Sequence, residues 1–308
     1  MAVKLKELQQ KFETAVDLYQ NDGSEEVARI TWLKALQSLG TQLNYGITPY
    51  EREWDILIVL DACRYDLFTE NAPRHQIYDR FLDIEPIYSC ASTSLEWMKK
   101  SFSNNIKQTQ NTFYITANGF VNELDSTHFF DVENVYEYGI DPDFNIVPPE
   151  PVTNAALYHY RNSSASKYII HYAPPHAPFL HCPGKYDSIN GNSQNVWDGL
   201  RKNKYCVNDV WEDYGQNLLN VLDHVEILLD NMSGKIAITS DHGNAIGEWG
   251  IYGHPGYVPI PDIKRVPWIE TEGLDLNTYD TNPEDIRSDK ELDDQEVEEH
   301  LQDLGYML

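Results

Sequence analysis

The sequence predicts an α/β protein in which a mostly parallel central sheet is flanked by helices. Two observations carry this prediction: three short apolar runs each lead to an aspartate or a histidine, and a long helical pattern separates the last two runs. Strands that alternate with helices along a chain are typical of parallel sheets.

The three runs predict the central strands. The first, WDILIVL over residues 54–60, leads to Asp61, and its unbroken apolar stretch from 56 to 60 predicts burial on both faces. The second, KYIIHY over residues 167–172, precedes APPHAPF, and the third, KIAITS over residues 235–240, precedes Asp241. Residues 207–229 repeat apolar side chains at helical spacing, so they predict a helix between these two strands.

Helical patterns also occur near both ends of the chain. Apolar residues recur near helical spacing over residues 3–20 and 24–43, which predicts a helical N-terminal extension over residues 1–50. We expect this extension to pack on a main α/β domain over residues 51–272. Residues 273–308 are predicted to form an acidic C-terminal tail with a helix from Asp289 to Leu304.

The charge of the chain is strongly negative. It has 49 acidic and 23 basic residues, a formal net charge of −26, and residues 270–308 alone hold 14 acidic and two basic ones. We expect no nucleic-acid partner, because basic side chains supply most of the affinity for a phosphate backbone. Like charges destabilise a compact state unless salt screens them, so the composition predicts an acidic, halophilic protein.

No sequence signal predicts export or a membrane anchor. The four cysteines show no CxxC spacing, and the first twenty residues lack the apolar core of a secretory signal. No apolar run is long enough to cross a bilayer. We therefore expect a cytoplasmic protein with reduced thiols and no membrane span.

Residues that can bind a divalent metal gather at the predicted strand ends. Asp61 follows the first strand, His176 lies just past the second, and Asp241-His242 follow the third. Ligands collect at the carboxyl ends of parallel strands, so we expect one shared site. A strand-end aspartate is often only a helix cap, but that alternative is weak for three ends at once. Aspartate and histidine without thiolates favour Zn, Mn or Mg, as one ion or two.

A glycine-rich loop follows the third strand. Asp241 and His242 would point to opposite faces of a continuous strand, so the chain has to turn here, and Gly243 permits that. The loop continues as NAIGEWGIYGHP, and a fold back of this segment would bring His254 to the same site. Taken alone, a histidine in a loop is more often a surface residue than a ligand.

The stretch SDHGNAIGEWGIYGH resembles the metal motif of the alkaline phosphatase superfamily, in its sulfatase-like branch. The pattern is most similar to that of phosphoethanolamine transferases, and lipoteichoic acid synthases are a looser match. The resemblance covers residues 54–270. It implies an alkaline phosphatase-like fold in which Asp61, Asp241 and His242 bind the metal. It also implies that His176 and His254 line the substrate side or a second metal.

The resemblance further implies a hydroxyl nucleophile at the start of a helix, where backbone N–H groups favour an anionic ester. The segment SCASTSLEW over residues 89–97 fits that place. Alignment with the Cys-Gly-Thr pattern of the transferases makes Ser92 the nucleophile and a metal ligand, with Thr93 as the second candidate. Coordination to the metal would activate this hydroxyl. A plain helix cap is the alternative, because Thr93 and Glu96 are spaced as a capping box.

The chain departs from the pattern of the superfamily in ways that narrow the chemistry. Sulfatases form formylglycine within Cys/Ser-x-Pro/Ala-x-Arg, and no complete motif of this kind surrounds Cys63 or Cys90. The membrane-embedded transferases carry transmembrane helices that this sequence lacks, which weakens the case for lipid-anchored substrates. The acidic ligands of the second metal in alkaline phosphatases have no obvious counterpart in this sequence. The number of metal ions, one or two, therefore stays open.

Residues beside the predicted ligands have weaker signals. Arg64 is predicted to hold an ester oxygen, with an ion pair as the alternative. His171 and His181 flank His176 and are predicted to be structural. His176 itself is a candidate catalytic and substrate-binding residue, and His254 is a candidate substrate-binding residue.

These observations favour a metal-dependent hydrolase or transferase of phosphate-type esters that uses a Ser or Thr nucleophile; sulfate esters are less favoured. Its substrate would be a small-molecule ester or an ester of a glycan or lipid headgroup. The alternative is a metal- or ligand-binding protein that keeps the fold without turnover. A purely structural acidic protein would leave the glycine-rich metal motif unexplained.

Overall fold

The computed structural model describes residues 24–43, 45–186 and 196–281. Its centre is a seven-stranded sheet in the order β2-β9-β6-β1-β5-β3-β4, beside a two-stranded hairpin of β7 and β8. In chain order the strands are Ile56–Leu60 (β1), Asp83–Tyr88 (β2), Thr112–Thr116 (β3), Asp131–Asn134 (β4), Lys167–Tyr172 (β5), Gly234–Thr239 (β6), Ala245–Ile246 (β7), Tyr252–Gly253 (β8) and Arg265–Gly273 (β9).

The sheet is mostly parallel, as predicted. β1 lies in its middle, pairs in parallel with β5 and β6, and has all five residues buried. β3 and β4 extend the parallel part beyond β5. β9 runs antiparallel to β6 on one side and to β2 on the other. The three predicted strands are therefore β1, β5 and β6, and they lie next to one another.

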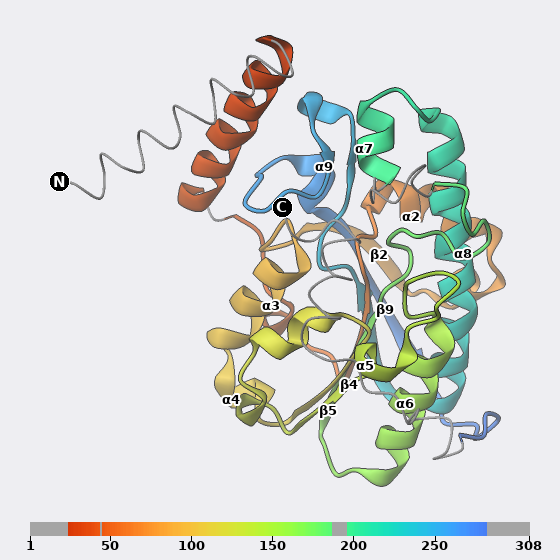
Figure 1. Cartoon of the computed structure of the whole chain (residues 1–308). Helices are drawn as coiled ribbons and strands as arrows, with labels where there is room; N and C mark the ends of the chain where they lie inside the picture. Colours follow the sequence, from red (N-terminus) through yellow and green to blue (C-terminus); the bar gives the residue numbers. More distant parts are fainter. Residues whose placement is uncertain (1–23, 44, 187–195, 282–308) are drawn as a thin grey trace.

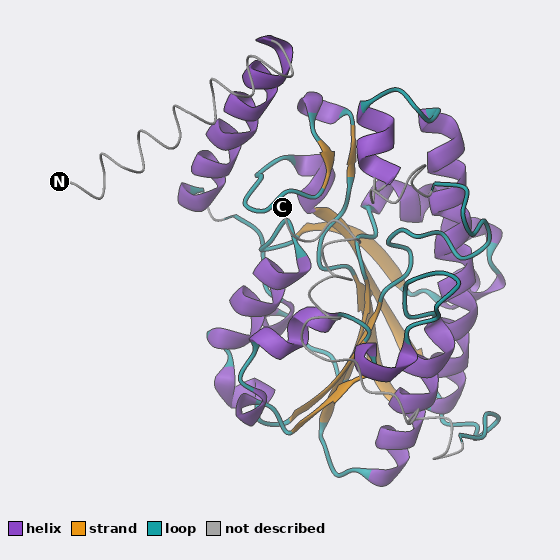
Figure 2. Cartoon of the chain, viewed as in Figure 1, coloured by secondary structure: helices purple, strands orange, loops and turns teal. Residues whose placement is uncertain are grey.

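Helices cover both faces of the sheet (Figures 1 and 2). α3 and α4 lie on one side, and α2, α6 and α8 lie on the other. The predicted helix over residues 207–229 is the 25-residue α8, the longest of the described helices. The labelled helices are Tyr65–Asn71 (α2), Ser94–Ser103 (α3), Ile106–Thr109 (α4), Tyr136–Gly139 (α5), Pro149–Asn162 (α6), Val196–Arg201 (α7), Val207–Asn231 (α8) and Pro261–Lys264 (α9). Short 3₁₀ helices complete the set, at Pro49–Glu51, Ala72–Arg74, Gln76–Arg80, Gly119–Glu123, Ser126–His128 and Glu248–Gly250.

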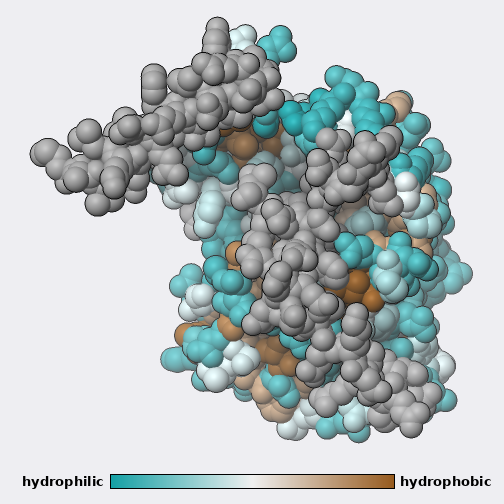
Figure 3. Space-filling model, viewed as in Figure 1, coloured by the Kyte–Doolittle hydropathy of each residue, from teal (hydrophilic) through white to brown (hydrophobic). Residues whose placement is uncertain are grey.

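Two of the predicted helices, residues 3–20 and Asp289–Leu304, lie outside the described residues. Among the helices that are described, none has the length and apolar character needed to cross a bilayer. The face of the molecule in Figure 3 is largely hydrophilic where it is described.

A helix over residues 24–42, here called the N-terminal helix, stands at the edge of the molecule (Figure 1). It packs against the loop that follows β6, where Leu36 joins a small separate core with five buried apolar residues: Ala245, Ile251, Val258, Ile260 and Ile263. Trp32 Nε1 also donates to the carbonyl of Trp249, and Gln37 Nε2 donates to that of Gly256. The helix therefore braces the glycine-rich loop predicted to carry site residues.

Gly40 sets how closely the N-terminal helix approaches this loop. A Cβ at this position would lie 1.8 Å from the carbonyl oxygen of Tyr257. We expect Gly40→Ala to lower the free energy of unfolding by about 1–3 kcal/mol, because backbone has to move. Gly256→Ala is the control, since its Cβ would meet only Thr93 Cγ2 at 3.8 Å and should change stability by less than about 0.5 kcal/mol. Denaturant unfolding of both variants measures the difference, and equal effects would contradict the close approach.

Candidate active site

The carboxyl ends of the three central strands bring two aspartates and a histidine together. Asp61 directly follows β1, Asp241 lies just past β6, and His171 is near the end of β5. All three are fully buried. Nε2 of His171 lies 3.7 Å from Oδ2 of Asp61 and 3.7 Å from Oδ2 of Asp241. One ligand atom from each residue lies within 4.8 Å of the other two, a spacing that can hold a metal ion.

His242 closes this cluster from the other side. Its Nε2 lies 3.4 Å from Oδ2 of Asp241 and 3.7 Å from Oδ1 of Asp61. Its Nδ1 donates to the carbonyl of Gly243 at 3.0 Å, and because a carbonyl only accepts, Nδ1 carries the proton in the neutral ring. The lone pair of Nε2 therefore faces carboxylate oxygens.

In this buried space, lone pairs of carboxylate oxygens and imidazole nitrogens face one another. Such lone pairs repel unless a cation lies between them. No described Lys or Arg forms an ion pair with Asp241, and within the described chain its Oδ2 and Nε2 of His171 make no hydrogen bond of normal geometry. Buried polar atoms ordinarily have partners, so these two groups mark a place for a missing one. Two carboxylates and two imidazoles suit Zn or a similar divalent ion. The donor set fits a metal.

Burial holds three histidines of the site, His171, His176 and His254, in the neutral form. Burial is the main cause that lowers the pKa of His171 and of His176 to about 4. It also lowers the pKa of His254 well below its ordinary value, and the neighbouring His242 lowers all three further. A neutral imidazole is the form that binds a metal.

Asp241 is held in its charged form. Burial alone would raise the pKa of Asp241, but the neighbouring His242 and His171 outweigh it, together with hydrogen bonds from the Ala62 amide and from Ser94. The pKa of this carboxyl therefore lies below its ordinary value. A carboxylate is the form that ligates a cation.

Ser94 is the hydroxyl that reaches the cluster. Its Oγ lies 3.2 Å from Oδ2 of Asp61 and 3.2 Å from Nε2 of His242. Ser94 is buried and is the first residue of the ten-residue helix α3, so it stands where backbone N–H groups and the helix dipole favour an anion. Nδ2 of Asn118 donates to the same Asp61 oxygen at 3.0 Å and orients that carboxylate.

The two predicted nucleophiles make other contacts. Oγ of Ser92 donates toward Oε2 of Glu96 at 3.0 Å and toward the carbonyl of Pro255 at 3.1 Å. Thr93 is the N-cap of α3, and its Oγ1 accepts from the Glu96 amide at 3.3 Å. The helix-cap alternative therefore describes Thr93, and among the described residues neither hydroxyl forms a hydrogen bond with Asp61 or Asp241. Sequence reasoning missed Ser94, although the residue after an N-cap was a usable signal.

His176 and His254, the two histidines predicted to line the substrate side or a second metal, form a pair beside His242. Their Nε2 atoms lie 3.2 Å apart, and both side chains are buried. The ring of His254 stacks on that of His242, with centroids 4.5 Å apart and an interplanar angle of 12°. The glycine-rich loop does fold back, and it brings a second row of imidazoles to the edge of the carboxylate cluster.

Arg64 lies in an ion-pair network and not against the carboxylate cluster. Its guanidinium contacts Asp66 at 2.6 Å and Glu248 at 2.7 Å, and it lies 5.0 Å from the ring centroid of Trp211. The ion-pair alternative therefore describes this residue better than a substrate contact. Its aliphatic stem lines the turn, where a Cβ on Gly243 would lie 2.8 Å from Cγ of Arg64. Gly243 thus serves a close approach rather than a left-handed backbone.

The two histidines predicted to be structural lie in different surroundings. His181 pairs with Asp213 at 3.0 Å near the start of the long helix α8, away from the carboxylate cluster. His171 instead lies between Asp61 and Asp241. Its sequence signal was weak because it lies within the strand, one residue before its end.

Comparisons with known proteins were made on sequence and on structure. No protein family model and no curated protein matches the sequence. The soluble domain of lipooligosaccharide phosphoethanolamine transferase A from Neisseria meningitidis matches with a TM-score of 0.51 and 14% identity, over 72% of this chain and 77% of that chain. The integral membrane form of that transferase matches with a TM-score of 0.52 and 14% identity, over 89% of this chain and 61% of that chain.

The chain has an alkaline phosphatase-like fold. The prediction of this fold is confirmed by these similarities. A protein of the alkaline phosphatase superfamily from Vibrio parahaemolyticus matches more weakly, with a TM-score of 0.41 and 12% identity over 82% of this chain and 71% of that chain. At such identities the likeness concerns the fold, and the chemistry has to be argued from the site.

Proposed function

We propose that this protein is a metal-dependent enzyme that transfers or hydrolyses phosphate-type esters, with Ser94 as its nucleophile. The observation that carries the proposal is the position of the Ser94 hydroxyl, 3.2 Å from both Asp61 and His242, at a helix N-terminus inside a buried carboxylate–imidazole cluster. Similarity to phosphoethanolamine transferases supports an ester of phosphate, as a fold-level analogy.

Each residue of the carboxylate–imidazole cluster would have its own role in the reaction. Asp61, Asp241 and His242 would hold a divalent metal, with His171 at the same centre; the ion would lower the pKa of a hydroxyl and stabilise developing negative charge. Oγ of Ser94 forms a bond to phosphorus while the bond from phosphorus to the leaving oxygen breaks. The Ser94 proton passes to Oδ2 of Asp61, which lies 3.2 Å from Oγ, and the leaving oxygen takes a proton from solvent.

The second half of the reaction releases the phosphoryl group from Ser94. Water or an acceptor alcohol attacks phosphorus, its proton returns to the site, and the bond from phosphorus to Oγ breaks. His176 and His254 lie beside His242, where their rings would line the space that the ester occupies. Sulfate esters are a weaker candidate, because the chain lacks a complete formylglycine motif.

Metal removal tests the proposal directly. We expect the chelator-treated protein to lose at least roughly 10³-fold in its rate on aryl phosphate mono- or diesters, because the hydroxyl is a poor nucleophile without the ion. Adding back Zn, Mn or Mg should restore the rate, and aryl sulfate should react more slowly. Bound metal is measured by elemental analysis of the same samples. A protein that binds no divalent metal would contradict the proposal, and one that binds metal without turnover would be the binding protein considered as the alternative.

A further inference from the structure

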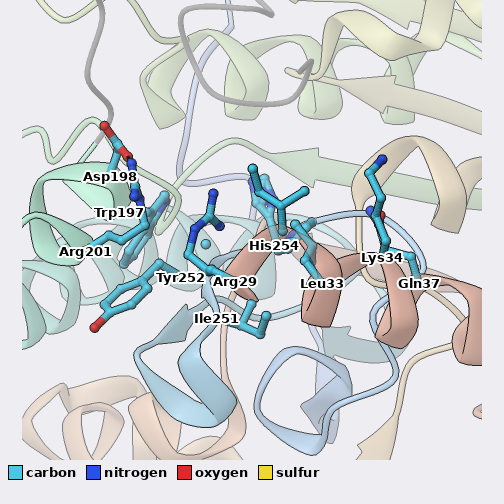
Figure 4. Close-up of a pocket in the computed structure, with 13 residues that line it drawn as sticks. Arg29, Leu33, Lys34, Gln37, Trp197, Asp198, Arg201, Ile251, Tyr252 and His254 are labelled. Carbon is cyan, nitrogen blue, oxygen red and sulfur yellow. Dashed lines mark hydrogen bonds and ion pairs between the residues drawn. The ribbon is translucent and has the colours of Figure 1, made fainter. Parts of the chain in front are cut away.

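A pocket of about 450 Å³ opens between the N-terminal helix, α7 and the β8 segment. Its volume lies in the usual range for small-molecule sites. His254 lines this pocket and also stacks on His242 of the carboxylate cluster, so the pocket and the candidate active site share a wall. Figure 4 shows Arg29, Leu33 and Lys34 along the N-terminal helix, with His254 between Arg29 and Lys34 in this view.

The pocket carries positive charge in a strongly acidic chain. Three cations line it, Arg29, Lys34 and Arg201, against one carboxylate, Asp198. The whole chain has about the opposite ratio, with 49 acidic and 23 basic residues. A cleft with one sign of charge raises the local concentration of ligands of the other sign.

The ion pairs of the pocket leave cationic donors available. Arg29 uses Nε and Nη2 for Glu26, at 2.8 Å and 2.6 Å, and Nη1 makes no hydrogen bond with the described residues. The hydrogen bond to Glu26 is the main cause that raises the pKa of Arg29, so the guanidinium stays charged. Lys34 is exposed and makes no ion pair with the described chain. Arg201 is more fully engaged, since it contacts both Glu26 and Asp198.

Aromatic rings form one end of the pocket, beside Arg29 (Figure 4). Trp197 is buried and Tyr252 is half-buried, and both line the pocket beside Arg29. Gly253 allows this wall to pack closely, because a Cβ there would lie 3.3 Å from Cδ1 of Trp197. Apolar and aromatic walls with a few placed charges are typical of sites for organic ligands. Such walls favour a ring over a bare inorganic anion.

We propose that this pocket binds the leaving-group side of the ester, and that it selects a leaving group that joins a ring to a second anionic group. This inference rests on the proposed function. With phosphorus at Ser94, the leaving oxygen extends past His254 into the pocket, where its ring packs on Trp197 and Tyr252. Its carboxylate or second phosphate meets Arg29 and Lys34.

Matched esters test the selection. The phenyl and 4-carboxyphenyl esters of phosphate and of methyl phosphate differ only by one carboxylate on the leaving group. We expect the protein to prefer the carboxylated esters by about tenfold in kcat/KM, which corresponds to about 1.4 kcal/mol. In Arg29→Gln/Lys34→Gln this ratio should fall to near one. Lys107→Gln/Lys235→Gln is the control, because it removes two equal charges far from the pocket and should keep the ratio.

A binding measurement tests the pocket independently of catalysis. Calorimetric titration with 4-hydroxybenzoate should show binding that weakens about tenfold in Arg29→Gln/Lys34→Gln and not in the control variant. Binding of this kind without turnover of any ester would refute the proposed function and keep the pocket. The pocket proposal would be overturned if the preference for carboxylated esters survived in Arg29→Gln/Lys34→Gln. It would also be overturned if 4-hydroxybenzoate did not bind, or bound equally well to this variant and to the control variant.

Discussion

Replacing Ser94 with alanine is expected to lower the turnover of a phosphate ester by roughly 10³-fold or more, because the reacting oxygen is lost. The side chain is small and begins a helix whose N-cap is Thr93, so the cap hydrogen bond remains and the fold should persist. Metal content should also persist, since both carboxylates and both imidazoles of the cluster are untouched. Single-turnover kinetics, with elemental analysis of the same sample, measures both.

Ser92→Ala is the matched control. Oγ of Ser92 binds Glu96 and accepts from the Val258 amide at 3.2 Å, so its loss should cost about 1 kcal/mol of stability. It should leave turnover within about tenfold of the original protein, because no hydrogen bond among the described residues joins Ser92 to Asp61 or Asp241. The reverse pattern, with Ser92→Ala inactive and Ser94→Ala active, would restore the nucleophile predicted from the sequence.

The contrast between these two serines shows how far sequence reasoning reaches in this chain. The segment with small hydroxyl residues was found, because a run of hydroxyls before a helical pattern is a readable signal. Which hydroxyl faces the cluster depends on the residue at which α3 begins. That start is fixed by the Thr93 cap and by the packing of α3, where Trp97 contacts His171 of β5 and Phe102 contacts Tyr114 of β3. A helix boundary is the feature that a sequence predicts least well.

The strands of the sheet also differ in how well the sequence predicts them. β1, β5 and β6 were predictable because they are buried on both faces and are therefore apolar along their length. β2 was not, because it is an edge strand with mostly exposed or half-buried residues and a proline at position 86. β9 was hidden by Pro267 and by its polar residues Glu270 and Thr271, although it holds β2 onto the sheet.

The strand-end ligands were predictable for a topological reason. Parallel strands that neighbour one another end at the same edge, so Asp61 and Asp241 had to lie close together once β1 and β6 were adjacent. His171 was not predictable as a ligand, because the sequence does not show which face of β5 it occupies or which strand lies beside it. Its role follows only from the distances of 3.7 Å to both aspartates.

Replacing Asp241 with asparagine is expected to remove most of the stabilisation that a divalent metal gives to the folded protein. A ligand present at about 100 times its dissociation constant adds about 2.7 kcal/mol to the free energy of unfolding. Asparagine keeps the size of the side chain and loses the charge, so the ion loses one of its two carboxylates. We expect thermal unfolding with Zn in excess to show a large upward shift in Tm for the original protein and little shift for Asp241→Asn.

The metal-free state shows what the substitution costs without an ion. The pKa of Asp241 lies below its ordinary value, so its carboxylate stabilises the folded protein at neutral pH. Asp241→Asn should therefore lower the stability of the metal-free protein by about 1–3 kcal/mol, and the metal site is tested by the further shift in Tm that Zn gives to each variant. Asp223→Asn is the control, because Asp223 is exposed and pairs only with His75 among the described residues. If Zn shifted the Tm of Asp241→Asn as much as that of this control, the carboxylate cluster would not be the metal site, and Ser94 would lack the ion that its chemistry requires.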